Sequence, residues 1–110
     1  MRGHQKANAT GKAEFLTIFP GWYPGRTPHI HMKVWIGGDA VHTGQVFFNE
    51  RIAAAVYRQA PYAGRGRYDT PHSQDSIYEQ AGGSTAELKL TTRTDGLKGY
   101  VGTIAIGVVT

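Results

Sequence analysis

The 110-residue chain contains no cysteine, which excludes a disulfide framework and any zinc or iron–sulfur site built from thiolates. It also lacks a long apolar run, since its longest mostly apolar stretches, residues 15–20 and 103–110, are far shorter than the roughly 20 residues of a membrane span. Charges interrupt the first fifteen residues, so we expect no signal peptide in this chain and no membrane partner. A cytoplasmic location is the default expectation, and secretion would require an upstream segment.

The chain also lacks a concentrated block of charge. Its net charge is +4, but the twelve lysines and arginines are spread along the sequence. Basic and aromatic residues mix in one segment, at Arg58, Arg65, Arg67, Tyr57, Tyr62 and Tyr68. Such a mixture can bind single-stranded nucleic acid, but a glycine-punctuated surface loop is the simpler reading because no basic stripe continues elsewhere. We therefore expect no nucleic-acid partner.

What the chain does have is turn residues: fifteen glycines and five prolines favour short strands over a helical bundle. Alternating and β-rich stretches predict strands over residues 14–19, 29–36, 43–48, 85–92 and 98–109. Asn49 is a predicted N-cap for one short helix over residues 50–59, and residues 60–84 read as a long irregular segment. We predict a single, mostly β domain over residues 1–110, a β-sandwich with one short helix.

The strand over residues 29–36 carries the strongest chemical signal. Alternation places one set of side chains, Ile30, Met32, Val34 and Ile36, on one face and the other set, His29, His31, Lys33 and Trp35, on the opposite face. Two histidines at positions i and i+2 of a strand point the same way, with Cα atoms about 6.5 Å apart, so both imidazoles can reach one metal ion. The pair alone is weak evidence for a metal site, because two histidines at this spacing also occur on solvent-exposed faces of strands.

The context strengthens the metal reading. Tyr23 lies on the turn before the strand, and Arg26 lies three residues ahead of His29. The segment from Phe19 to His31 resembles the metal-site segment of the intradiol ring-cleavage dioxygenases. The resemblance extends back through residues 2–5, 11 and 15–18 and forward through residues 43–48, and it is looser beyond Asn49.

This resemblance implies a β-sandwich enzyme with a mononuclear, non-haem Fe(III) held by two tyrosinates and two histidines. Tyr23, His29 and His31 match three of those four ligands. Arg26 matches an arginine that steadies negative charge on the substrate, and Gln45 matches a glutamine that lines the pocket. The implied reaction is cleavage of a catechol-type aromatic diol by dioxygen to a muconate-type diacid, in which Tyr23 leaves the metal and accepts a substrate proton.

The chain departs from the family pattern at one ligand. The family's first tyrosine lies in an N-terminal half, upstream of the segment at which this sequence begins. The resemblance therefore implies the C-terminal catalytic portion of the domain, and we favour a fragment or a truncated gene model. Two further possibilities stay open: a shortened homologue that completes its site with another of its own residues, and a homo-oligomer in which a partner copy supplies the ligand.

The other tyrosines and histidines are not assigned to the site. We expect the downstream tyrosines to pack or to hydrogen-bond through their hydroxyls; these are Tyr57, Tyr62, Tyr68 and Tyr78. We expect the remaining histidines to lie at the surface; these are His4, His42 and His72.

Two other classes of function stay open. One is a non-catalytic β-sandwich module that binds a carbohydrate or a protein through Trp22, Trp35 and Tyr23. The other is an inactive remnant of the dioxygenase that binds metal weakly. Neither predicts a strongly coloured metal centre.

Overall fold

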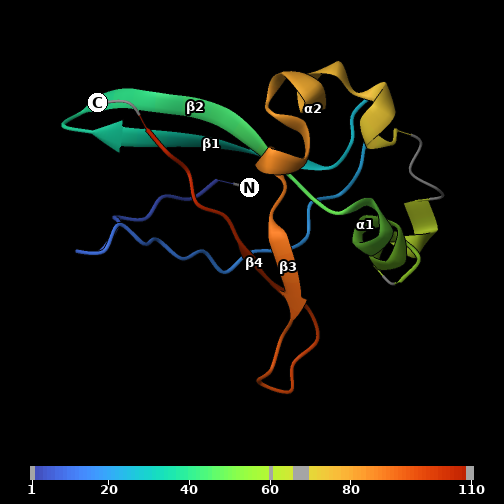
Figure 1. Cartoon of the computed structure of the whole chain (residues 1–110). Coiled ribbons are helices and arrows are strands. Elements are labelled where there is room, and N and C mark those ends of the chain that lie inside the picture. Colours follow the sequence, from blue (N-terminus) through green and yellow to red (C-terminus); the bar gives the residue numbers. More distant parts are fainter. Residues whose placement is uncertain (1, 60, 66–69, 109–110) are drawn as a thin grey trace.

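The computed structural model describes residues 2–59, 61–65 and 70–108, which form two small antiparallel sheets and two short helices (Figure 1). The strands are β1 (His29–Ile36), β2 (Asp39–Phe47), β3 (Lys89–Thr92) and β4 (Tyr100–Thr103). The helices are α1 (Glu50–Tyr57) and α2 (Ser76–Gln80), with 3₁₀ turns η1 (Ala63–Arg65), η2 (His72–Gln74) and η3 (Gly83–Ala86). The mostly β class is confirmed, as two two-stranded sheets over the described residues.

Strands β1 and β2 form a long hairpin that projects to one side of the molecule (Figure 1). Gly37 and Gly38 make its turn with φ of +59° and +86°, values that favour glycine because a Cβ is strained there. β1 has its predicted bounds. β2 begins earlier than the predicted strand over residues 43–48, because residues 39–42 also pair with the end of β1.

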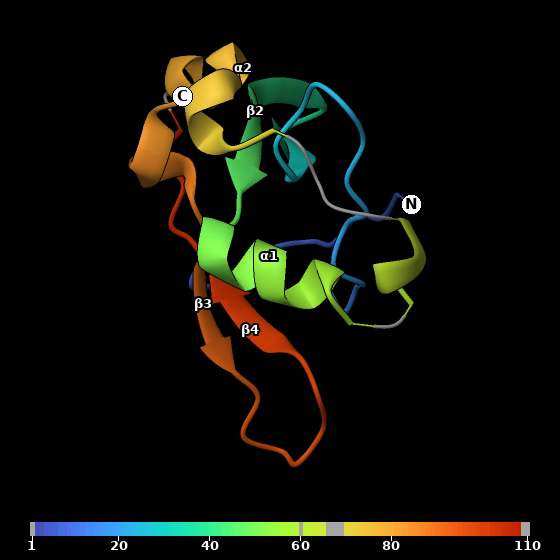
Figure 2. The same ribbon diagram turned by 90° about the vertical axis from the view of Figure 1, so that its right-hand side faces the viewer.

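Helix α1 follows directly from β2 and starts at the predicted cap. The Asn49 side chain accepts hydrogen bonds from the backbone N–H groups of Arg51 and Ile52, at 2.9 and 3.2 Å. Ala53 and Tyr57, one turn apart, are the buried residues of this helix. The helix ends at Tyr57, two residues before its predicted end. Figure 2 shows α1 following the chain that leaves β2.

The segment predicted as irregular contains a second helix, so the prediction of one helix is wrong. Asp75 caps α2 by accepting from the N–H groups of Ile77 and Tyr78, at 3.0 and 3.4 Å. A five-residue helix is too short to show a helical repeat of apolar residues, which is why the periodicity missed it. Residues 66–69, including Arg67 and Tyr68 of the predicted surface loop, lie outside the described residues.

Three strand predictions need correction. Residues 14–19 form no strand, because no described segment pairs with their backbone, and Phe15, Leu16 and Ile18 are 57%, 91% and 62% exposed. β3 and β4 are each four residues long, shorter than the predicted 85–92 and 98–109. The η3 turn takes up residues 83–86, and the chain leaves the pairing after Thr103; Val109 lies outside the described residues.

The core lies where the two hairpins meet. Phe47, at the end of β2, is fully buried and forms a cluster with Tyr78 of α2 and Ala86 of η3. The Leu88 N–H donates to the Phe47 carbonyl at 2.8 Å, so the approach to β3 runs alongside the end of β2. This junction anchors the end of the hairpin that carries His29, the register partner of Phe47. Among the described helices, none is both long and apolar enough to cross a bilayer.

Candidate metal and substrate site

The two histidines of β1 lie on one face of the strand, as predicted. Their ring centroids are 5.0 Å apart. His29 is buried at 9% exposure, whereas His31 is exposed, because only the first residue of the strand reaches the core junction. The pair therefore presents one buried and one solvent-facing imidazole on a common surface.

The hydrogen bonds of His29 fix which ring nitrogen is free to bind. Its Nδ1 lies 2.8 Å from the carbonyl oxygen of Thr27, and since a carbonyl only accepts, Nδ1 carries the proton. The lone pair is then on Nε2, which lies 3.1 Å from the Tyr23 hydroxyl. Metal-binding histidines commonly donate their second ring N–H to a backbone carbonyl in this way.

The surroundings of His29 also favour its neutral form. Burial is the largest effect and lowers its pKa below the ordinary value of 6.5, and the positive charge of Arg26 acts in the same direction. The nearby His31 also lowers the pKa of His29. These three effects outweigh the Thr27 carbonyl and Asp75, which act to raise it. A neutral imidazole is the form that coordinates a metal ion.

Tyr23 is placed by the tight turn before β1. Its carbonyl accepts from the Arg26 N–H at 3.5 Å, and the two residues form an isolated β-bridge. The turn leaves the Tyr23 ring 47% exposed and its hydroxyl donating to the Nε2 lone pair of His29. A phenol oxygen and an imidazole nitrogen thus converge, and a phenolate oxygen and a neutral imidazole nitrogen are both atom types that can coordinate a metal ion.

Arg26 and Gln45 complete the group. A terminal nitrogen of the Arg26 guanidinium donates to the Gln45 side-chain oxygen at 2.6 Å, and the other lies 3.4 Å from Nε2 of His29. Gln45 lies on β2, directly opposite His31 in the register. The fold therefore brings all five predicted site residues, Tyr23, Arg26, His29, His31 and Gln45, to the base of one hairpin.

Asp75 is a member of this group that the sequence reading missed. One carboxylate oxygen accepts from Arg26 Nε at 2.8 Å and from the Thr27 backbone N–H at 2.9 Å. Burial acts to raise the pKa of Asp75, but these hydrogen bonds and the charge of Arg26 outweigh it and hold the pKa below the ordinary value. The only sequence signal was an aspartate at a helix-capping position.

A cavity of about 270 Å³ adjoins the group. His31 and Gln45 line it from the hairpin, together with Thr43 and Gly44, and α2 and its C-cap contribute Ile77, Gln80 and Ala81. Helix α2, which the sequence did not predict, therefore forms one wall of the space beside the candidate ligands.

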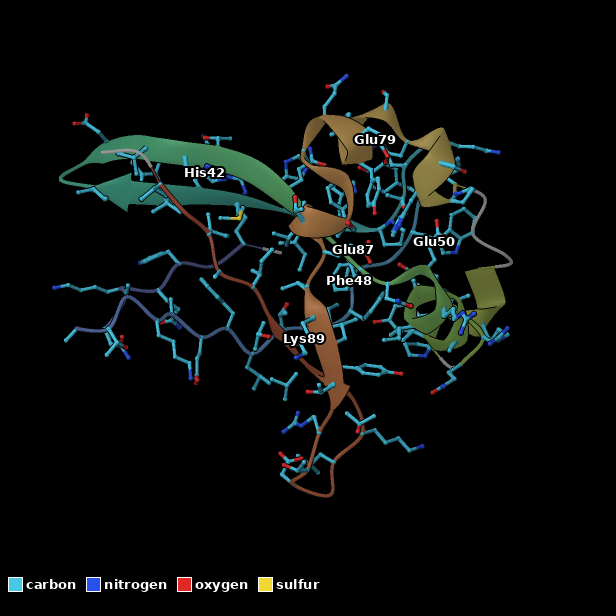
Figure 3. The ribbon with its side chains drawn as sticks, in the orientation of Figure 1. His42, Phe48, Glu50, Glu79, Glu87 and Lys89 are labelled. Atoms are coloured by element: carbon cyan, nitrogen blue, oxygen red, sulfur yellow. The ribbon has the colours of Figure 1, made fainter. Side chains whose placement is uncertain are left out.

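The remaining histidines lie elsewhere. His4 is exposed, and His42 lies out along the hairpin (Figure 3). The surface prediction is wrong for His72, which stacks on Tyr78 with ring centroids 4.0 Å apart and lies 2.9 Å from the Phe48 carbonyl. Among the described residues, no group of three or more His, Cys, Asp or Glu side chains is arranged to hold a metal ion. The candidate donor set is instead two histidines and a tyrosine.

The downstream tyrosines are used in packing, as predicted. The hydroxyls of Tyr57 and Tyr62 donate to backbone carbonyls of residues 20 and 19, both at 2.6 Å. Tyr78 donates to Glu87 at 2.7 Å, and burial together with this carboxylate raises its pKa to about 12. Tyr68 lies outside the described residues. None of the three described hydroxyls joins the group around His29.

No protein-family model matches the sequence, and no curated protein matches it. Among solved structures, an intradiol ring-cleavage dioxygenase from Tetranychus urticae is 26% identical with a TM-score of 0.73, over 83% of this chain and 44% of that one. A second solved dioxygenase is 32% identical with a TM-score of 0.72, over 77% of this chain and 42% of its own. The chain thus spans less than half the length of either structure. The resemblance inferred from residues 2–48 is confirmed, and over most of its length this chain has the structure of part of an intradiol ring-cleavage dioxygenase.

Proposed function

We propose that this chain provides the iron-binding and substrate-facing part of a non-haem Fe(III) centre that cleaves a catechol-type diol with dioxygen to a muconate-type diacid. The observation that carries the proposal is the convergence of the Tyr23 hydroxyl and one Arg26 nitrogen on Nε2 of His29, at 3.1 and 3.4 Å. Similarity to a solved intradiol ring-cleavage dioxygenase supports the reaction class.

The donor set fits ferric iron. Tyr23, His29 and His31 would hold the ion, since a phenolate oxygen is an anionic donor and His29 already has its Nε2 lone pair directed at the phenol. When bound, Fe(III) acts as a Lewis acid that favours the ionised diol and activates its ring toward dioxygen. The described residues offer no second tyrosinate beside His29, so a further ligand would come from another chain or from residues outside this set.

Tyr23 would act as the base for a substrate hydroxyl. A free phenol has a pKa near 10, so a phenolate at this position would readily accept a proton from a substrate hydroxyl. The ring is half-exposed and lies on a turn rather than in the core, which supports a role at the substrate side of the site. Its hydroxyl donates to Nε2 of His29, so its proton is directed into the candidate site.

Arg26 would stabilise negative charge on the bound diol. Its guanidinium carries a positive charge, and its two terminal nitrogens face His29 and Gln45. A charge fixed in place before the reaction stabilises a transition state without reorganisation. Gln45 borders the cavity and is held by Arg26, so its amide would orient the diol beside His31.

Metal analysis of histidine variants tests the centre. We expect the purified chain incubated with ferric iron to bind it, and His29→Ala and His31→Ala each to weaken binding by at least about tenfold through loss of a ligand. His4→Ala is the matched control, because this histidine is exposed and outside the site. Unchanged iron content in both site variants would show that the ligands are misassigned. A folded chain that binds no iron would favour the binding module or the inactive remnant.

The visible spectrum tests Tyr23. A tyrosinate on Fe(III) gives a charge-transfer band that a histidine-only site lacks, so we expect a band in the parent chain and its loss in Tyr23→Phe. With one tyrosine ligand, the band should be weaker than that of a two-tyrosinate centre. Tyr100→Phe, at the start of β4, is the control and should keep the band. Full colour and full catechol cleavage in Tyr23→Phe would assign the ligand to another tyrosine.

A further inference from the structure

Asp75 is 49 residues from Arg26 in sequence but touches it in the fold, with its side chain 1% exposed. Its Oδ2 accepts from Arg26 Nε and from the Thr27 N–H, while its Oδ1 accepts from the two N–H groups that begin α2. Both oxygens are therefore used, one toward the candidate site and one toward the helix that lines the cavity.

The consequence for Arg26 is geometric. A guanidinium is planar and rigid, so fixing Nε limits where the two terminal nitrogens point. With Nε on Asp75, one terminal nitrogen faces His29 and the other faces Gln45. Without the carboxylate, the long side chain, 19% exposed, would be free to turn toward solvent.

We propose that Asp75 is a positioning residue: it holds the Arg26 guanidinium against His29 and Gln45 and, through the cap of α2, ties that orientation to the helical wall of the cavity. This inference rests on the proposed function for its catalytic consequence. Its structural content, the orientation of Arg26, does not depend on iron or on activity.

The chain contains a matched pair for comparison. Arg93 and Asp95 make a similar contact at the surface, with Arg93 Nε donating to Asp95 at 3.1 Å and the Leu97 N–H donating to the same carboxylate oxygen at 3.1 Å. This pair is bidentate, because a terminal nitrogen of Arg93 also donates to the other oxygen of Asp95. This pair lies on the β3–β4 turn, and Asp95 is exposed. Asp95→Asn therefore removes the same chemistry outside the site.

NMR on the isotope-labelled chain without iron tests the orientation. In the parent, the Arg26 Nε proton should exchange with water at least about tenfold more slowly than that of Arg93, because its acceptor is buried. Asp75→Asn still caps α2 but turns its amide group toward Arg26, so we expect fast exchange and shifted Gln45 side-chain amide and His29 imidazole signals. Asp75→Ser, a shorter capping residue, should do the same, and Asp95→Asn should shift only the Arg93 signal.

Kinetics with catechol on the iron-loaded chain test the consequence. Asp75→Asn should lower kcat/KM by about 10- to 100-fold, as loss of a supporting hydrogen bond commonly does, while keeping the bound iron. If Asp75 acts through Arg26, the same substitution in an Arg26→Lys background should have a much smaller effect.

Two results would overturn the positioning role: an Arg26 Nε proton in the parent that exchanges as fast as that of Arg93, or a folded Asp75 variant whose Gln45 and His29 signals stay in place. A folded chain that binds no iron would refute the proposed function alone, since the NMR comparison still decides the orientation of Arg26.

Discussion

At the scale of single residues, burial decides which charges matter. The Lys12–Glu14 ion pair has a 3.0 Å separation, but both side chains are more than two-thirds exposed, so water screens it and its contribution is small. The Arg26–Asp75 pair is slightly shorter, at 2.8 Å, and largely removed from water. Removing either Arg26 or Asp75 leaves the other charge largely buried without its hydrogen-bond partner, and this lowers the free energy of unfolding strongly.

We expect Asp75→Asn to lower the free energy of unfolding by about 3 kcal/mol at neutral pH. The folded state holds the pKa of Asp75 below its unfolded value of about 3.9, so its contribution is complete above that pH and is lost as pH falls through the folded pKa. The difference between parent and variant should therefore shrink below about pH 4. Urea unfolding from pH 7 down to pH 3 measures it, and a difference that does not depend on pH would contradict this account.

At the scale of elements, a β-rich sequence became a strand only where a neighbour was available. β1 and residues 14–19 both read as strands, but only β1 has an adjacent segment in the described chain with which to pair. An unpaired strand leaves its N–H and C=O groups to water and gains nothing from an extended conformation. Apolar composition alone, as at Phe15, Leu16 and Ile18, does not supply the partner.

Hydrogen exchange tests this contrast between the two segments. We expect backbone amides of residues 14–19 to exchange at the rate of an unstructured peptide and the paired amides of β1 and β2 to be strongly protected. The measurement is amide exchange of the purified chain followed by mass spectrometry or NMR. Protection of residues 14–19 equal to that of β1 would show that the segment is paired in solution.

At the scale of the whole molecule, one small core holds the parts together. Phe47 joins β2 to α2 and η3, and its ring lies 5.1 Å from that of Tyr78 in an edge-to-face contact. Its register partner is His29, so the same residue that anchors the hairpin also supports the candidate site. This junction therefore contributes both to stability and to the geometry of the candidate site.

Phe47→Ala should cost about 3 to 5 kcal/mol, because it opens a cavity at a fully buried position. A domain of this size has a total stability of only about 5 to 15 kcal/mol, so the variant should unfold at far lower denaturant or fail to accumulate. Phe15→Ala removes the same side chain where it is 57% exposed and should change stability by less than about 0.5 kcal/mol. Equal losses in the two variants would show that the core lies elsewhere.

Features that depend on neighbours along the chain were predictable from the sequence alone. The alternation of residues 29–36 predicted the bounds of β1 and the shared face of His29 and His31, because side-chain direction in a strand follows from local geometry. Asn49 marked the start of α1 for a similar reason, since its side chain bonds N–H groups two and three residues later.

Features that depend on contacts between distant segments became visible only in the tertiary structure. It paired Asp75 with Arg26, made α2 a wall of the cavity, stacked His72 on Tyr78 and left residues 14–19 without a strand partner in the described part of the chain. The capping position of Asp75 is a local signal for α2, but none of these contacts has one, because a long-range contact is selected by the packing of the whole chain rather than by propensity or period. The sequence therefore predicted the five candidate site residues, but it did not predict the Asp75 carboxylate that contacts Arg26.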